Sequence, residues 1–446
     1  MRQMVRTIKA YCPRLFELMD ALPDNRRTST YTMAEIITGC LAMYLLKETS
    51  RNALDHDRQN AVFRTNYQKI FKKRLPHMDT ADNVITQLSQ EELESLKAAF
   101  ITGLIEHRAL HRFKLFGKYF MVAIDGTGIN SYKENNEEQN LTSKTSKNGL
   151  TTFFSHVVEA KLVTSSGLSI SIASEWVINQ LDNGTIDLKF NKQDCELRAF
   201  QRLSKSIKKY YPRLSICILA DGLYPNQTFM KTCQDNGWAY IVVFKDKSLN
   251  VLQEDIKDVE NKNRHSLGVD IIRRKGRECI HQKYEWISEP LTHAGHTVYW
   301  LSCTETISYR DKNLKVISVE EPTRFVNLTN IKVDKDNVRG ISNAGRMRWK
   351  IENEGFNTQK NGGYCLGHKY SRDSFTAYKN YYQCMQIAHI INQLVEKSTD
   401  MAALQETDSK LSIKQLWTEL MSWLRCCIVD PAVIELNERK QIRLAG

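Results

Sequence analysis

The sequence predicts a mixed α and β fold (α+β or α/β), in which a mixed β-sheet is flanked by helices and carries a β-rich insertion. Residues 1–113 have apolar side chains at helical spacing, and residues 114–244 contain short apolar runs that are typical of buried strands. Helical spacing returns in a C-terminal region, residues 372–446. With 446 residues, of which 41% are apolar, the chain can bury a sizeable core.

Net charge, apolar runs and cysteine spacing indicate which partners and which cellular compartment to expect. The net charge of +12 favours a nucleic-acid partner, although a basic surface that only aids solubility is an alternative. There is no apolar run long enough to cross a bilayer and no basic leader followed by an apolar run, so we expect a cytoplasmic protein without membrane contact. The eleven cysteines lack CxxC spacing, which indicates reduced packing residues rather than a zinc site.

The first region, residues 1–113, is predicted to be entirely helical. Ser89 and Glu92 have the spacing of a capping box at the start of one of its helices. Basic residues occur at the joins between helices, and Lys72, Lys73 and Arg74 would suit contacts to DNA phosphates. The alternative is a helical cap with solvated charged loops.

The second region, residues 114–244, is predicted to build most of the sheet. Ser165-Ser166-Gly167 should join two antiparallel strands, and the polar segment 132–147 should be a loop over the site. In chain order we expect strands at 118–124, 153–163 and 168–177, a helix at 193–210, a strand at 214–220, a helix opened by Pro225 and a strand at 238–244.

Two acidic residues end apolar runs in this region. Asp125-Gly126 follows one predicted strand and Asp221-Gly222 follows another. Either pair alone is typical of a turn. Together with Glu352 on a later helix, they offer three hard oxygen ligands, the kind that hold a pair of Mg²⁺ ions in phosphoryl transfer.

The helix that carries Glu352 belongs to a fourth region, residues 338–371. We expect it to end at Asn361-Gly362-Gly363, because glycine adopts the left-handed C-cap conformation with little steric cost. Arg348 lies four residues before Glu352, hence on the same side, and apolar neighbours should partly desolvate that carboxylate. The alternative is an exposed ion pair on an amphipathic helix.

Between these regions lies the insertion, residues 245–337, which is predicted to be β-rich. Trp286 and Trp300 lie at strand spacing in it, where aromatic residues are core residues more often than ligands. Arg273 and Arg274 belong to a basic cluster in a predicted hairpin turn that could contact phosphates.

Three motifs carry a family resemblance. AIDGT, LADGLYPN and RWKIENEGF supply Asp, Asp and Glu in that order, and together they resemble DDE transposases of bacterial insertion sequences, in the branch with a Tyr-Arg-Glu-Lys signature. The likeness spans about residues 118–369. Arg348 and Glu352 keep the signature spacing, whereas its Tyr position falls on Gly345 and its Lys position on Gln359, one residue before Lys360.

The resemblance implies a function and its residues. Residues 114–244 and 338–371 would form an RNase H-like catalytic core, in which Asp125, Asp221 and Glu352 hold Mg²⁺ (or Mn²⁺). Arg348 and Lys360 would neutralise phosphate charge beside the cleaved bond. The family uses its N-terminal helical domain to read terminal inverted repeats and its insertion to support a flipped base. The resemblance therefore implies that Trp286 and Trp300 are the candidates for stacking on DNA bases.

The same resemblance implies the partners. These would be double-stranded DNA, both transposon terminal inverted repeats and target DNA, and a second protomer in a homodimer on that DNA. The protein would then be associated with the nucleoid. Two alternatives remain open: an RNase H-like nuclease or resolvase without strand transfer, and a domesticated, non-catalytic DNA-binding protein.

Overall fold

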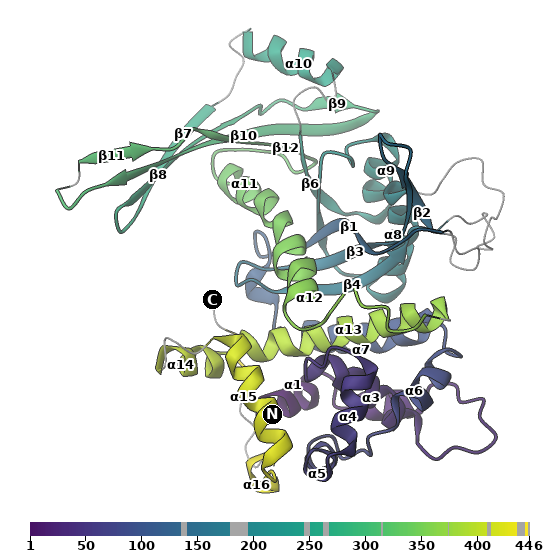
Figure 1. The fold of residues 1–446 in the computed structure, drawn as a ribbon. Helices are drawn as coiled ribbons and strands as arrows, with labels where there is room; N and C mark the ends of the chain where they lie inside the picture. The colour runs from purple at the N-terminus through teal and green to yellow at the C-terminus, as the bar shows by residue number, and fades with distance from the viewer. Residues whose placement is uncertain are drawn as a thin grey trace. The chain divides into compact units, whose positions relative to one another are not determined.

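The computed structural model describes residues 1–134, 141–178, 195–244, 250–261, 267–313, 315–372, 374–407, 412–434 and 442–444 (Figure 1). The chain divides into two compact units. Unit 1 comprises Met1–Arg112, Gly126–Pro212 and Lys350–Gly446, and unit 2 comprises Phe113–Asp125 and Arg213–Trp349. The first boundary, after Arg112, lies next to the end of the region that the sequence predicts to be helical.

The N-terminal part of unit 1 is helical, as predicted. Every residue of α3 is buried, and its first turn is closed by a capping box between Thr32 and Glu35. The predicted capping box of Ser89 and Glu92 opens α7. The helices are α1 (Arg2–Tyr11), α2 (Leu15–Asp20), α3 (Met33–Leu45), α4 (Arg51–Gln59), α5 (Ala61–Phe71), α6 (Met78–Ile85) and α7 (Gln90–Glu106), followed by the short η1 (His111–Phe113), which crosses into unit 2.

A long C-terminal helix, α13 (Phe375–Glu396), organises unit 1. It is buried along almost its whole length and packs against α1, α3, α7 and strand β4 (Figure 1). The shorter helices α14 (Thr399–Thr407), α15 (Ile413–Cys426) and α16 (Pro431–Ile434) follow it. The helical N- and C-terminal regions therefore share one core, which their separation in the sequence does not reveal.

The strands of unit 1 confirm the predicted hairpin. β3 (Thr151–Val163) and β4 (Ser169–Trp176) pair antiparallel, and Gly167 takes a φ of +84° in the turn between them. A further strand, β2 (Thr142–Thr145), pairs with the start of β3. Helix α8 (Glu196–Tyr210) packs on β3 and β4. The start of the helix predicted at 193–210 falls on residues outside those described.

Unit 2 contains the parallel part of the sheet. β1 (Phe120–Tyr132) pairs parallel with β5 (Ile216–Ala220), and β5 pairs parallel with β6 (Ala239–Val243). Helix α9 (Gln227–Asn236) connects β5 to β6. The expectation that the strand bearing Asp125 lies beside the strand that leads to Asp221 is confirmed.

The insertion is rich in strands, as predicted, and it continues the same sheet. β12 pairs antiparallel with β6, and β10 lies between β12 and β8. Its elements are α10 (Asn250–Asn261), β7 (Leu267–Lys275), β8 (Glu278–Trp286), β9 (Leu291–His293), β10 (His296–Arg310), β11 (Val316–Val319) and β12 (Thr323–Thr329). Helix α10 was not predicted, because its segment reads as a charged stretch.

Across the described residues the strands form one mixed sheet of twelve, flanked by helices, in the order β2-β3-β1-β5-β6-β12-β10-β8-β7, with β4 on β3 and β9 and β11 on β10. The mixed α and β class is therefore confirmed. Strand β1 takes part in both units, because their boundary falls between Asp125 and Gly126.

Two local predictions are wrong. β1 does not stop at Asp125 but continues to Tyr132, and β2 occupies part of the segment predicted as a loop. The polar, glycine-containing run after Asp125 remains a strand because β3 lies beside it and can satisfy its backbone groups. The middle of the predicted loop, residues 135–140, lies outside the described residues.

The segment around Glu352 is helical but irregular. It consists of α11 (Val338–Arg346), the 3₁₀ turn η2 (Met347–Trp349), the π-helix η3 (Ile351–Asn357) and α12 (Thr358–Asn361). It ends at the predicted stop, where Gly363 has a φ of +90°. π-Helical turns are rare, and they occur frequently at functional sites.

Candidate active site

Asp125 and Asp221 lie at the same edge of the parallel part of unit 2. In the register of the two strands Ala123 pairs with Leu219, and Asp125 and Asp221 each lie two residues after these positions. Because the strands are parallel and in register, both acids come at the carboxyl end of the pairing. Open α/β sheets bind ligands at this end of their strands.

The local structure fixes each carboxylate. Asp221 follows β5 directly, and its Oδ1 accepts a hydrogen bond from the backbone N–H of Leu223 at 2.9 Å. This Asx turn orients the side chain as the chain leaves the sheet. Asp125 lies within β1, with 23% of its side chain exposed. Both acids therefore stand at the sheet edge on backbone that is held in place.

Arg348 belongs to the same edge of unit 2. Its Nη1 lies 3.4 Å from Oδ2 of Asp125, and only 9% of its side chain is exposed. It follows α11, which packs on β5, β6 and β12, and the 3₁₀ turn η2 contacts β5. The partner of Arg348 in unit 2 is thus Asp125 on the sheet.

Trp349 was missed by the sequence reasoning. Its indole is 52% exposed, and the guanidinium of Arg348 lies 4.4 Å from the ring centroid. With half of its surface in solvent beside the Arg348–Asp125 pair, Trp349 is not a core residue. The available signal in the sequence was its position next to Arg348.

Glu352 is exposed, which corrects the expectation of a partly desolvated carboxylate. The buried side of the π-helix is formed by Ile351, Gly355 and Phe356. A regular α-helix pattern misassigned the faces because this segment changes from a 3₁₀ turn to a π-helix within a few residues. Glu352 belongs to unit 1, whereas Asp125 and Asp221 belong to unit 2.

The Lys position of the family signature falls on a buried residue. Gln359 has no exposed surface and donates to Oε1 of Gln386 at 2.8 Å, with its amide 2.9 Å from Nδ1 of His389. Lys360 is exposed and donates to Oγ1 of Thr127 at 3.3 Å. The residue able to meet a phosphate at this point of unit 1 is therefore Lys360.

The two tryptophans proposed to stack on DNA are in the core of unit 2. Trp286 and Trp300 are 1% and 2% exposed, and the indole N–H of Trp286 donates to Oγ of Ser288 at 3.2 Å. They lie on neighbouring strands, with Trp286 paired to Leu301 and Trp300 to Leu328. This burial corrects the stacking expectation and favours the alternative, that both are packing residues.

The basic hairpin has the predicted turn. β7 and β8 pair up to Lys275 and Glu278, and Gly276 takes a φ of +63° between them. Arg273 is an exposed strand residue that donates to the side chain of Gln282. Arg274 lies opposite Cys279 in the ladder. Arg273 and Arg274 therefore lie on strand positions before the turn and not in the turn itself.

The basic cluster after α5 has mixed roles. Lys72 is exposed and caps α5 with a φ of +56°. Arg74 instead forms a bidentate ion pair with Glu35: its Nε donates to Oε1 of Glu35 at 2.7 Å and its Nη2 donates to Oε2 at 2.8 Å. Burial pushes the pKa of Glu35 up, and hydrogen bonds from Arg74 and Thr32 outweigh it, so that this pKa lies below its usual value. Lys73 lies 3.7 Å from Asp20.

A pair of substitutions separates these roles. Lys72→Gln is expected to change the free energy of unfolding by less than about 0.5 kcal/mol. If this surface meets phosphates, it should weaken DNA binding and lower the salt slope of log Kd by about 1. Arg74→Ala removes the guanidinium that pairs with the buried Glu35 carboxylate, so it should lower stability more than Lys72→Gln does. Urea unfolding and fluorescence anisotropy at several salt concentrations measure both. Equal stability losses in the two variants would contradict this assignment.

A separate acidic group in unit 1 has a structural explanation. Ligand atoms of Asp55, His77 and Asp79 lie within 4.8 Å of one another. However, Asp55 accepts from the backbone N–H of Met78 at 3.0 Å, and Nδ1 of His77 caps α6 through the N–H of Asp79. Holding the start of α6 accounts for the group.

Comparison with known proteins adds no identity. No family model matches the chain, and no curated protein matches its sequence. Among the described residues, none of the helices is long and apolar enough to cross a membrane.

Proposed function

We propose that the chain is a metal-dependent DDE transposase that cuts and joins phosphodiester bonds at the ends of an insertion sequence. One observation carries the proposal: the parallel, in-register pairing of β1 and β5 brings Asp125 and Asp221 to one edge of the sheet. The third acid would be Glu352, which follows Arg348 by four residues in the chain. The acids keep the order and motifs that the resemblance requires.

The sheet order supports an RNase H-like core. Antiparallel strands β3 and β4 precede α8, which is followed by the parallel strands β5 and β6, and β1 stands between β3 and β5. Apart from the short strand β2, this is the arrangement of three strands, helix, strand, helix that such a core needs. In it β1 and β5 are neighbours; β1 carries Asp125, and Asp221 follows β5.

The donor set fits a divalent metal. Carboxylate oxygens are the hard ligands that Mg²⁺ and Mn²⁺ take in phosphoryl-transfer sites. Arg348 places a positive charge 3.4 Å from Asp125, and this pairing of the carboxylate with a cation supports the proposal. Asp125, Asp221 and Glu352 would hold the metal ions, which activate the attacking oxygen and stabilise the leaving one.

The remaining residues would handle the DNA. Arg348, beside Asp125, would neutralise charge on the phosphate at the cleaved bond. Lys360 would do the same from unit 1, where it bonds to Thr127. Trp349, exposed and oriented by its cation–π contact, would offer a stacking face for a base beside that phosphate. It replaces Trp286 and Trp300 in this role.

The test uses DNA from the flanks of the gene that encodes the chain. Purified protein is incubated with a labelled duplex carrying the terminal repeat, a target plasmid and Mg²⁺ or Mn²⁺. We expect cleavage at the repeat boundary, followed by joining of the freed 3′ end to the plasmid. Cleavage without joining of a pre-cut end would favour an RNase H-like nuclease. Binding without either reaction would favour a non-catalytic DNA-binding protein.

A further inference from the structure

Two lysines of unit 1 are completely buried. Lys97 on α7 and Lys161 on β3 both have 0% exposed surface. Burying an ammonium group is costly unless it is paired and hydrogen-bonded. The two ammonium groups differ in the number of hydrogen-bond and ion-pair partners around them. They also differ in the helices and strands that they connect.

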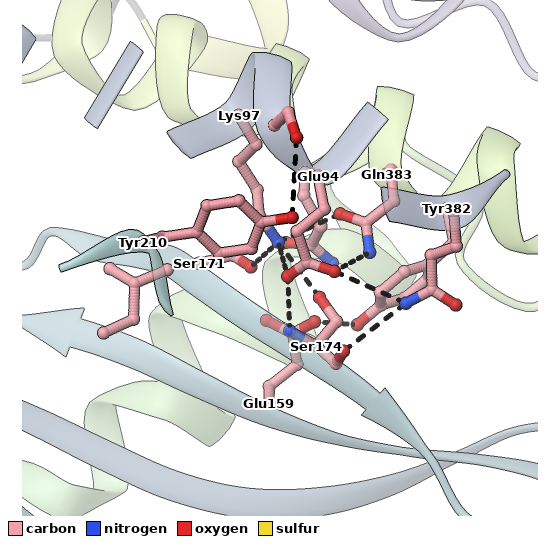
Figure 2. A network of polar contacts seen from close by, with 12 residues as sticks. Glu94, Lys97, Glu159, Ser171, Ser174, Tyr210, Tyr382 and Gln383 are labelled. Carbon is pink, nitrogen blue, oxygen red and sulfur yellow. Dashed lines mark hydrogen bonds and ion pairs between the residues drawn. The ribbon is translucent and has the colours of Figure 1, made fainter. Parts of the chain in front are cut away.

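Lys97 has a full set of partners. Its Nζ donates to Oγ of Ser171 and Oγ of Ser174, both at 3.1 Å, and to Oε1 of Gln383 at 2.9 Å. Oε1 of Glu94 lies 3.3 Å away and compensates the charge. Figure 2 shows this network between α7, β4 and α13. Lys97 therefore acts as a structural tie between helices and sheet.

Lys161 lies against the helix of Glu352 instead. Its Nζ is 5.1 Å from the ring centroid of Phe356, and it donates to Oε1 of Gln386 at 3.2 Å. Its Cδ and Cε lie 3.2 and 3.5 Å from where a Cβ on Gly355 would stand, and Oγ of Ser169 lies 3.0 Å from the same point. A Cβ at Gly355 would be tighter against these atoms than most contacts, so the glycine lets the π-helix lie close to β3 and β4.

A relay of amides extends the contact to α12. Gln386 on α13, which accepts from Lys161, also accepts from Nε2 of Gln359 at 2.8 Å, and Gln359 lies 2.9 Å from Nδ1 of His389. All of these side chains are buried. The buried side of the π-helix and α12 is thus held at two points, by Lys161 against Phe356 and by Gln386 at Gln359. Glu352 lies on the exposed side.

The polar surroundings of Lys161 are incompletely satisfied. Oε2 of Glu159, Oγ of Ser169 and Nε2 of His389 are buried without a hydrogen-bond partner among the described residues. Oε1 of Glu159 accepts from the hydroxyl of Tyr382 at 2.8 Å. Such a network is a poor source of stability, since buried polar groups contribute only when they are fully paired.

We infer that Lys161 is a positioning residue, which holds the π-helix Ile351–Asn357 against β3 and thereby fixes the direction of the Glu352 carboxylate. Its importance for catalysis rests on the proposed function, whereas the contact itself does not. Sites that break local folding rules, such as an under-satisfied buried lysine beneath a π-helix, are expected where function requires them.

The free energy of unfolding should depend on pH because the ammonium group of Lys161 is buried. Burial lowers the pKa of Lys161 to about 8, with Glu159 opposing and Lys97 adding to the effect, and His389 facing it from α13. Between pH 8 and the usual value of 10.5 the unfolded chain binds more protons at this site, so the contribution of Lys161 to stability rises with pH. Any stability advantage of Lys161→Met should therefore shrink over this window, as measured by urea unfolding. A constant difference would show that Lys161 does not titrate there.

The positioning role is tested in the full chain with Lys161→Met and Gln386→Leu, and with Lys97→Met as the matched buried-lysine control. Hydrogen–deuterium exchange of residues 351–361 is measured below all melting transitions, together with the Mn²⁺ concentration for half-maximal cleavage of end DNA. We expect both variants of the relay to exchange about tenfold faster in 351–361 and to need about tenfold more Mn²⁺. Lys97→Met should lower the melting temperature without either change.

The outcomes separate the two proposals. If the wild-type chain cleaves no end DNA, the proposed function fails, and exchange alone decides the role of Lys161. If the wild type cleaves and Lys161→Met keeps both wild-type exchange and wild-type Mn²⁺ dependence, the positioning role is overturned. Should Lys161→Met fail to fold, Gln386→Leu, which breaks the same relay without removing a charge, gives the answer: wild-type values in that variant also overturn the role.

Discussion

Neutralising any one of the three acids should abolish cleavage of transposon-end DNA. For Asp125→Asn, Asp221→Asn and Glu352→Gln we expect the rate to fall about 100- to 1,000-fold or more, because each change removes charge that would hold the metal ions at the reacting phosphate. Binding of end DNA should survive, since it would depend on basic residues elsewhere. Gel assays of cleavage and binding with the same labelled duplex measure both quantities.

The thermal stability of these variants should differ. Asp125 is the partner of Arg348, whose side chain is only 9% exposed, so Asp125→Asn should lose about 1–3 kcal/mol of stability without metal. Asp221→Asn keeps an oxygen for the Asx turn and should be close to wild type. All three variants should lose most of the stabilisation that Mg²⁺ or Mn²⁺ gives the wild type, because a metal stabilises the folded chain it binds.

Glu354→Gln provides the matched control for Glu352→Gln. Glu354 lies in the same π-helix, but it is half-buried and pairs with Lys350 at 2.8 Å. Its substitution should leave cleavage and the response to metal nearly unchanged. Full cleavage by the Glu352 variant, with loss only in the Glu354 variant, would show that the third ligand is assigned wrongly. Full cleavage by both Asp variants would remove the transposase proposal.

The parts of the fold that sequence could predict are those with strong local signals. Apolar runs closed by Asp-Gly identified β1 and β5, and their pairing follows from the order of the elements. The Ser165-Ser166-Gly167 turn and the capping box at Ser89 have direct counterparts in the structure. Each of these depends on a few neighbouring residues, which is why a single sequence was sufficient.

The errors arise where distant residues decide. The strand after Asp125 persists because β3 lies beside it, and nothing in the local sequence reveals that neighbour. Glu352 is exposed because the backbone changes from a 3₁₀ turn to a π-helix, which α-helical spacing does not represent. The relay beneath this π-helix joins β3 to α13, and Lys161 and Gln386 are too far apart in the chain for a pattern to connect them.

The two buried tryptophans, Trp286 and Trp300, also show that a local pattern does not reveal distant neighbours. Their substitution is expected to have the second large effect, a loss of stability. Spacing on a strand separates its two faces but does not tell which face is covered. Trp286→Ala and Trp300→Ala should each destabilise unit 2 by about 3–5 kcal/mol, because both rings are buried and their removal leaves a large cavity. Urea unfolding followed by circular dichroism measures the loss, and the more conservative Trp286→Phe should lose less.

Trp349→Ala is the surface counterpart of these variants. Its ring is 52% exposed, so we expect a stability change of no more than about 0.5 kcal/mol. If it stacks on a base, the same change should weaken the DNA complex by about 1–3 kcal/mol. If Trp286→Ala and Trp300→Ala fold with wild-type stability and cleave end DNA, these rings are not core residues. A Trp349→Ala chain that binds and cleaves end DNA like the wild type would exclude stacking at this position, and the base beside the cleaved bond would then need another partner.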